Sequence, residues 1–188
     1  MRIHNKNVNT GVLAGGILVG AVASRLLPPL FANVNGSVRA KLGADPFQLL
    51  EEDHRSMELL LEKLRTSSDD SLAARTVAFM SLKRKIGKHA LAEEDVVYPL
   101  LHEQANAQED AYRLYREHAE MKIHLYELES ALKKNGEWKE RFQSFDYLIR
   151  EHIRDEEEKE FPRLREMLNE KQSISLSGLI RREESLVL

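Results

Sequence analysis

The sequence predicts an all-α protein, namely an antiparallel up-down-up-down four-helix bundle that is built from two similar helical hairpins. From residue 45 onward, apolar residues recur at alternating spacings of three and four along four successive stretches, which is the period of amphipathic helices. No stretch alternates apolar and polar residues with the period of two that marks a half-buried strand. The connections between the stretches are short and polar, which favours antiparallel neighbours in a bundle.

Charge divides the chain into a basic arm and an acidic body. Residues 1–44 of the 188-residue chain hold five basic and no acidic side chains, together with six of the nine glycines. Residues 45–188 hold 23 basic and 31 acidic side chains, a net charge of −8. This acidic excess argues against a nucleic-acid partner, because phosphate binding requires clustered lysine and arginine. The lack of cysteine excludes disulfides and thiolate metal sites.

The arm contains an apolar, glycine-rich segment over residues 11–31. Residues 12–23 are uncharged, and glycines recur in this segment at four-residue spacing, a pattern that lets membrane helices approach closely. We expect a membrane anchor or a membrane-associated helix near residues 12–31, with a signal peptide and a flexible apolar tail as the alternatives. We therefore predict a membrane-associated protein whose bundle faces the cytoplasm, with export to the periplasm as the alternative.

The first hairpin is predicted to begin at Asp45-Pro46, where an N-cap residue precedes a proline at the first helical position. The core-facing stripe of its first helix consists of Phe47, Leu50, His54, Met57, Leu61 and Leu64. A polar run over residues 66–71 ends this helix. The stripe of the second helix consists of Leu72, Phe79, Leu82, Ile86, His89, Glu93, Val96 and Leu100.

The second hairpin follows a polar break near Asn106. The stripe of its first helix consists of Ala111, Leu114, His118, Met121, Leu125, Leu128 and Leu132. Asn135-Gly136 is predicted to stop this helix. The stripe of the last helix consists of Trp138, Phe142, Phe145, Ile149, His152, Glu156, Leu164 and Met167. We place the bundle at residues 45–172 and expect residues 173–188 to form a short packing or docking segment.

Two prolines lie near the ends of the second and fourth stripes. Pro99 and Pro162 each lack the N–H that an α-helix needs, so we expect the helix to kink or end at both positions.

The apolar stripes carry a set of polar residues at matching depth. One histidine lies in the middle of each stripe, and two of the stripes carry a glutamate one turn later. These six residues are His54, His89, Glu93, His118, His152 and Glu156. Since buried carboxylates are costly unless they are paired or metal-bound, the set predicts a metal site inside the bundle.

An internal repeat relates the two hairpins. The segment HALAEEDVVYPLL from His89 matches HIRDEEEKEFPRL from His152, and DHRSMELLLEKL from Asp53 matches EHAEMKIHLYEL from Glu117. The offsets of 63 and 64 residues indicate one hairpin used twice about an approximate two-fold axis. Each hairpin therefore delivers two histidines and one glutamate.

Imidazole and carboxylate without thiolate suit iron, manganese or zinc, and two equivalent His/Glu sets suit a pair of metals. A residue and its i+4 neighbour lie on one helix face, so His89 and Glu93 reach the same centre, as do His152 and Glu156. We assign Glu93 and Glu156 as bridging ligands and the histidines as terminal ligands. Such a pair of divalent ions would keep open positions for O2 or NO.

This ordered set, with YP and FP after the glutamates, resembles the hemerythrin-like (HHE) cation-binding domain over about residues 45–170. The resemblance implies a non-haem di-iron centre with roles in O2 binding or sensing, in the handling of iron or oxidative stress, or in the repair of iron–sulfur clusters. Lys122 stands where oxygen-carrying hemerythrins have a further histidine, and their last carboxylate position falls on Glu157. Reversible oxygen carriage is therefore not expected.

Four other polar residues near the stripes were weighed as site residues. Glu58, Glu94 and Glu157 are predicted to be solvated, with a role as extra or neighbouring ligands as the alternative. Tyr115 is predicted to be a core residue, with hydrogen bonding to a metal-bound ligand as the alternative.

Our leading hypothesis is a di-iron protein that binds a small gas rather than a classical enzyme, since no nucleophile triad or phosphate loop is present. One alternative is a ferritin-like di-iron oxidase, although only Glu51-x-x-His54 fits its Glu-x-x-His pattern. The other alternative is a metal-free helical interaction module at a membrane.

Overall fold

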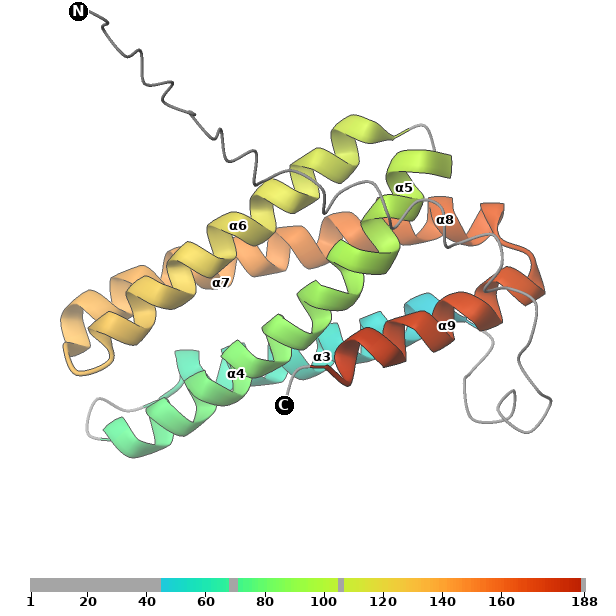
Figure 1. Ribbon diagram of the computed structural model, residues 1–188. Helices are drawn as coiled ribbons and strands as arrows, with labels where there is room; N and C mark the ends of the chain where they lie inside the picture. The colour runs from blue at the N-terminus through green and yellow to red at the C-terminus, as the bar shows by residue number, and fades with distance from the viewer. Residues whose placement is uncertain (1–44, 68–70, 105–106, 187–188) are drawn as a thin grey trace, which may run out of the picture. The chain divides into compact units, whose positions relative to one another are not determined.

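The computed structural model describes residues 45–67, 71–104 and 107–186 (Figure 1). These ranges contain helices and no strand, so the predicted all-helical class is confirmed. None of their helices combines the length and the apolar character that crossing a membrane requires. Residues 11–31, on which the membrane prediction depends, lie outside the described ranges.

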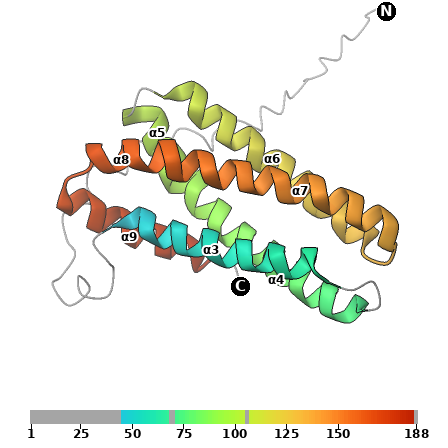
Figure 2. The same ribbon diagram turned by 180° about the vertical axis from the view of Figure 1, so that it is seen from behind.

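Four long helices carry the predicted stripes. Helix α3 (Pro46–Arg65) packs against α4 (Leu72–Ala92), α6 (Gln108–Ala131) packs against α7 (Asn135–Asp155), and α3 also contacts α7. The two pairs are visible from both sides of the molecule (Figures 1 and 2). Helix α3 begins as predicted, because the Asp45 carboxylate accepts a hydrogen bond from the Phe47 N–H at 3.0 Å.

The second and fourth stripes pass through a π-helical turn at the same place in the repeat. Helix α4 leads into η2 (Glu93–Val97) and α5 (Tyr98–Gln104), and α7 leads into η3 (Glu156–Glu160) and α8 (Phe161–Met167). In each turn an N–H bonds to the carbonyl five residues earlier, from Tyr98 to Glu93 and from Phe161 to Glu156. Such π-turns are frequent at functional sites.

Of the two outcomes predicted at the prolines, a kink or an end of the helix, the structure excludes the end. Pro99 and Pro162 are the second residues of α5 and α8, and the helical path continues through both. In π-register the missing N–H of Pro99 would have bonded to the carbonyl of Glu94. That carbonyl instead accepts a hydrogen bond from the Tyr115 hydroxyl at 2.7 Å, so the proline leaves no buried acceptor unpaired there.

The prediction for Asn135-Gly136 was wrong. Helix α6 already ends at Ala131, and Asn135 is the first residue of α7. The difference has a packing reason. Trp138 lies in the first turn of α7, and its side chain is buried in the core, so the helix begins at Asn135, three residues before it.

The C-terminal segment forms a further helix, α9 (Glu170–Glu184), which starts a few residues before the predicted boundary. Asn169 and Gln172 form a capping box at its start. Helix α9 packs against α3, α4 and η2, and it buries Ile174, Leu176 and Ile180. The segment therefore serves as packing for the first hairpin.

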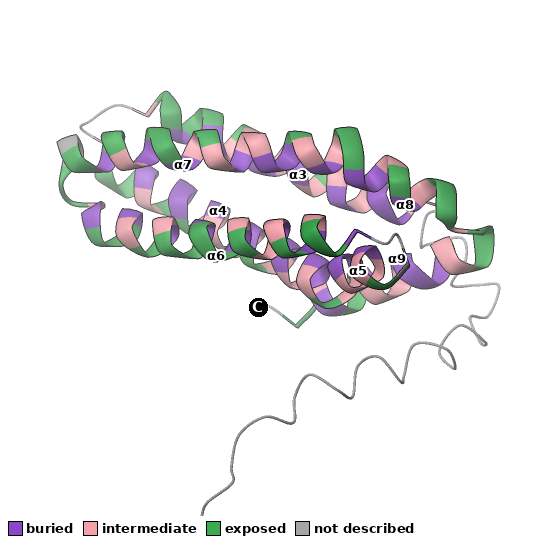
Figure 3. Cartoon of the chain, turned by 90° about the horizontal axis from the view of Figure 1, so that it is seen from above, coloured by how far each residue is buried: buried purple, intermediate pink, exposed green. Residues whose placement is uncertain are grey.

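Buried positions recur along each of the long helices (Figure 3), and the buried apolar residues form two clusters. One cluster includes Met57, Ile86 and Met121, and the other includes Leu50, Ala92 and Leu114. Along α3, α4 and α6 the stripe histidine falls between a member of one cluster and a member of the other. The polar site is therefore enclosed by apolar packing on both sides.

Trp138 is expected to be the largest single contributor to core packing near the α6–α7 connection. It is buried, stacks on Phe142 at 4.9 Å, and lies 5.2 Å from the guanidinium carbon of Arg75. We predict that Trp138→Ala lowers the free energy of unfolding by about 3–5 kcal/mol. Trp138 lies about 21 Å along α7 from His152, so metal content should not change. Denaturant unfolding measures the loss, and a decrease below about 1 kcal/mol would contradict the assignment.

Candidate metal centre

The structure brings all six predicted site residues together, and all six side chains are buried. They form two groups in which the candidate ligand atoms lie within 4.8 Å of one another. The first group is His54, His89, Glu93 and Glu156, and the second is Glu93, His118, His152 and Glu156. The two glutamates belong to both groups, which is the arrangement that bridging ligands require.

The histidines face one another in pairs through their Nε2 atoms. The Nε2 atoms of His54 and His89 are 2.8 Å apart, and those of His118 and His152 are 3.1 Å apart. Where the opposite ring nitrogen, Nδ1, donates its hydrogen to a carboxylate, the neutral imidazole presents a lone pair at Nε2. Lone pairs then converge on the centre of the bundle, where a cation between them would remove their repulsion.

Three of the four Nδ1 atoms contact a carboxylate. These contacts join His54 to Glu157 at 2.8 Å, His118 to Glu94 at 3.0 Å, and His152 to Glu117 at 2.8 Å. Carboxylates in this position fix the tautomer and the ring orientation of metal-binding histidines. The fourth, His89 Nδ1, lies 4.0 Å from Asp53.

Glu94 and Glu157 are partly exposed, and their contacts favour the alternative reading, in which they are neighbours of the candidate ligands. Each directly follows a glutamate of the site, and the π-turn presents it to the first-helix histidine of the other hairpin. The role of Glu117 was missed in the sequence. The repeat carried the signal, because Glu117 and Asp53 each precede a site histidine and lie opposite the second histidine of their own hairpin.

Tyr98 is the second functional residue that sequence reasoning missed. Its hydroxyl is buried in the site, donates a hydrogen bond to Glu156 Oε1 at 2.8 Å, and lies 2.9 Å from His118 Nε2. The repeat aligned it with Phe161 as one of two aromatic residues, which hid the hydroxyl group. Burial and the charges of Glu156 and Glu93 raise the pKa of Tyr98 well above its ordinary value, so it remains a hydrogen-bond donor.

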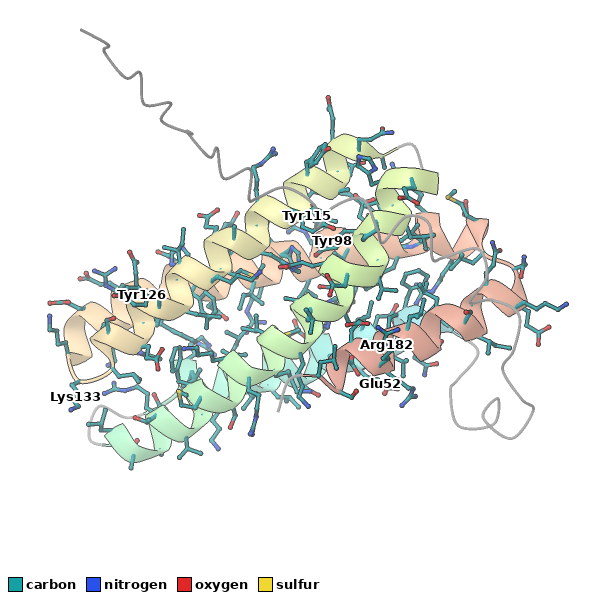
Figure 4. All side chains as sticks on the ribbon, in the orientation of Figure 1. Glu52, Tyr98, Tyr115, Tyr126, Lys133 and Arg182 are labelled. Carbon is teal, nitrogen blue, oxygen red and sulfur yellow. The ribbon has the colours of Figure 1, made fainter. Side chains whose placement is uncertain are left out.

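Other residues that were weighed as ligands lie outside the two groups. Tyr115 packs edge-on against Tyr98 with ring centroids 5.1 Å apart. Both residues are labelled in Figure 4, where α5 lies beside α6. Its hydroxyl bonds to main chain and not to the site. Glu58 contacts Arg150 at 3.5 Å, and Glu51 pairs with Arg165. Glu51 is thus not available for a ferritin-like ligand set.

The carboxylates raise the pKa of two site histidines. Burial lowers the pKa of His54, but the nearby carboxylates of Glu156 and Glu157 outweigh this and raise it to about 10. Burial likewise lowers the pKa of His118, and its own carboxylate partners raise it to about 9. In the metal-free chain these imidazoles therefore carry protons at neutral pH.

Glu93 shows the complementary pKa shift. Burial raises the pKa of Glu93, but the charge of His89 and the hydrogen bond with His118 hold it well below its ordinary value. The centre therefore keeps a buried carboxylate ionised and requires positive charge beside it, supplied by protons or by a cation.

Three buried polar atoms of the site lack a hydrogen-bond partner among the described residues, namely His89 Nδ1, Glu93 Oε1 and Glu156 Oε2. Unpaired carboxylate oxygens in a buried site are costly, and metal coordination satisfies them. Together with the facing Nε2 atoms, these oxygens form a donor set of nitrogen and oxygen that fits divalent iron, manganese or zinc.

A cavity of about 10 Å³ adjoins the centre. Its walls include three site histidines, His89, His118 and His152, and are otherwise apolar, with Met57, Ile86, Ala90, Met121, Ile149 and Ile153. A space of this size holds roughly one water-sized molecule.

The fold and the site together define a buried histidine–carboxylate cation-binding centre within a helical domain. The family model of the Hemerythrin HHE cation binding domain matches residues 45–164. The chain therefore belongs to the hemerythrin HHE cation-binding family, which confirms the resemblance that the spacing of histidines and glutamates indicated.

The chain is also similar to a curated protein, the DNA nickase of Nostoc sp. (strain PCC 7120). The two are 27% identical over 125 residues, which cover 66% of this chain and 35% of the nickase. The matched region thus spans about a third of the length of that relative.

Replacing Glu117 tests the role of the carboxylate behind His152. Glu117 is the hydrogen-bond partner of His152 Nδ1 and is held by Arg113 at 2.8 Å. We predict that Glu117→Ala weakens metal binding about 10–100-fold, the usual cost of losing such a partner. Competition with a chelator measures the affinity. Glu120→Ala, on an exposed face of the same helix, should change nothing, and equal affinities in both variants would contradict the role.

Proposed function

We propose that this protein is a non-haem di-iron protein that binds O2, NO or a related small oxidant. Its scaffold is an up-down-up-down bundle of two hairpins, and its metal ligands are His54, His89, Glu93, His118, His152 and Glu156. Support comes from the family, from the two His/Glu groups and, above all, from the apolar cavity against three of the four histidines. Manganese and zinc fit the same donor set.

The side chains of this chain would divide the work as follows. Glu93 and Glu156, which belong to both groups, would be shared by the two cations, and each pair of histidines would hold one cation. The carboxylates at the Nδ1 atoms fix ring orientation, and Tyr98 holds a proton on its hydroxyl beside Glu156. Bound ferrous ions would supply electrons and open coordination positions. The apolar walls of the cavity exclude bulk water from the bound gas.

The test begins with anaerobic iron loading of the full chain. Metal analysis should give about two irons per chain, and the visible spectrum should change when argon is replaced by O2 or by NO. The proposal would be overturned if the chain binds no iron, or if the visible spectrum of the iron-loaded chain is the same under argon, O2 and NO.

A cavity-filling variant tests the proposed gas pocket separately. Ala90 is buried and lines the cavity, so Ala90→Val should weaken gas binding at unchanged iron content. Ala131→Val is a matched control, because Ala131 is equally buried in the core about 20 Å along α6 from His118. Equal gas affinities in the two variants would count against this pocket.

The alternatives have weaker support. A ferritin-like oxidase would need Glu51, which is ion-paired with Arg165. In a metal-free module nothing would offset the cost of burying the unpaired oxygens of Glu93 and Glu156. We do not transfer the activity in the name of the Nostoc relative, because the acidic excess of residues 45–188 disfavours contact with phosphates. Membrane association through residues 11–31, with the bundle in the cytoplasm, is part of the proposal and rests on the sequence alone.

A further inference from the structure

The two cation positions share both glutamates but differ in everything else that surrounds them. We refer to the position beside His54 and His89 as the first position, and to the position beside His118 and His152 as the second position. The repeat makes their ligands equivalent. The neighbouring side chains break this equivalence in hydrogen bonding and in charge.

Tyr98 contacts the shared glutamates and, of the site histidines, those of the second position only, among the hydrogen bonds of the described residues. Its hydroxyl lies 2.8 Å from Glu156 Oε1, 2.9 Å from His118 Nε2 and 3.5 Å from both Glu93 Oε2 and His152 Nε2. A cation that enters the second position must compete with these contacts for the same atoms.

The first position has an apolar ring where the second has a hydroxyl. Phe161, the repeat partner of Tyr98, stacks on His54 with ring centroids 5.8 Å apart and an angle of 8° between the planes. It provides no hydrogen-bond donor to the ligands.

One unpaired carboxylate oxygen lies on the side of the first position. Glu93 Oε1 lies 3.0 Å from His89 Nε2 and 4.0 Å from His54 Nε2, and it has no hydrogen bond within the described chain. Glu156 Oε2 is also unpaired but lies between the two positions, 3.3 Å from His54 Nε2 and 3.4 Å from His152 Nε2. A cation in the first position therefore gains Glu93 Oε1 as a ligand atom that no hydrogen bond occupies.

Charge points in the same direction. At the second position both Nδ1 carboxylates are neutralised, Glu94 by Lys122 at 2.6 Å and Glu117 by Arg113 at 2.8 Å. At the first position Glu157 contacts His54 but has no lysine or arginine ion-pair partner in the described part of the chain. Among the described residues, Glu157 at the first position therefore lacks the direct ion pair that Glu94 and Glu117 have at the second position.

We propose that the two cation positions fill in order, the first position tightly and the second more weakly, and that Tyr98 and Lys122 set the difference. The proposal rests on the metal binding of the proposed function but not on its gas binding. Tyr98 and Lys122 act as positioning residues, because Lys122 acts through Glu94 and Tyr98 holds ligand atoms in hydrogen bonds.

Titration of the full metal-free chain with Co²⁺, followed by its visible absorption, tests this order. The wild-type chain should show two steps whose dissociation constants differ at least tenfold. Changing one hydrogen-bond partner of a metal ligand alters metal affinity by roughly this factor or more. Tyr98→Phe and Lys122→Met should each tighten the weaker step several-fold and leave the tighter step unchanged. Lys83→Met is the matched control, because Lys83 also pairs with a surface glutamate, Glu129, which contacts no histidine.

Glu157→Gln provides the converse variant at a partly exposed position that tolerates substitution. It should weaken the tighter step about tenfold and spare the weaker one. The proposal would be overturned if the wild-type chain binds both Co²⁺ ions with equal affinity. It would also be overturned if Tyr98→Phe or Lys122→Met changes the tighter step, or if Glu157→Gln changes the weaker one. In each case the proposed metal binding itself would stand. A chain that binds no Co²⁺ and no iron would overturn both.

Discussion

Changing Glu156 to Gln should weaken metal binding more than 100-fold at both cation positions. Glu156 Oε2 lies within 3.4 Å of a histidine Nε2 on either side, and the residue belongs to both groups. The amide keeps the shape of the side chain but replaces one oxygen with an NH2 group, which has no lone pair for a cation. Metal analysis after dialysis, and chelator competition with Co²⁺, would measure the loss.

The control for this variant lies four residues further along the chain. Glu160 is as deeply enclosed as a site residue and shares the π-turn η3 with Glu156, but it pairs with Arg113 and Arg163 instead of the histidines. Glu160→Gln should therefore retain full metal content. A Glu156→Gln chain that keeps both metals would contradict the bridging role. If the wild-type chain binds no metal and Glu156→Gln only lowers the stability of the fold, the metal-free module is favoured.

The ligand positions could be predicted from the sequence because they depend on helical period alone. A histidine in an apolar stripe must face the core, and a glutamate four residues later must lie beside it. Asp45-Pro46 was equally readable, since an N-cap acts within one turn.

The surroundings of the ligands could not be predicted in this way. Glu94 and Glu157 look solvated in an ideal α-helix, and the π-turn changes the direction in which they point. Glu117 reaches a histidine on another helix, and this depends on how α6 and α7 pack. The difference between Tyr98 and Phe161 has no periodic signal, because both rings fill the same apolar place in the repeat.

The stabilisation that metal gives to the protein should grow as pH rises from about 6.5 toward 9 and above. In the metal-free chain the charges and hydrogen bonds of carboxylates outweigh burial and raise the pKa of His54 to about 10 and that of His118 to about 9. A histidine whose pKa is raised on folding stabilises the fold fully below its unfolded pKa of about 6.5. That contribution falls as pH rises and is lost once pH passes the folded values.

A bound metal replaces these protons and supplies the positive charge at every pH at which it stays bound. The Tm of the metal-free chain should therefore fall over this range while that of the loaded chain stays nearly level. The difference between the two Tm values is the quantity to measure, because surface groups titrate alike in both forms and cancel. Glu157→Gln removes a hydrogen-bond partner of His54 and so lowers its folded pKa; the decline of the metal-free form should therefore be smaller and should end at lower pH. A constant Tm difference from pH 6.5 to 9 would show that protons do not occupy the place of the metal.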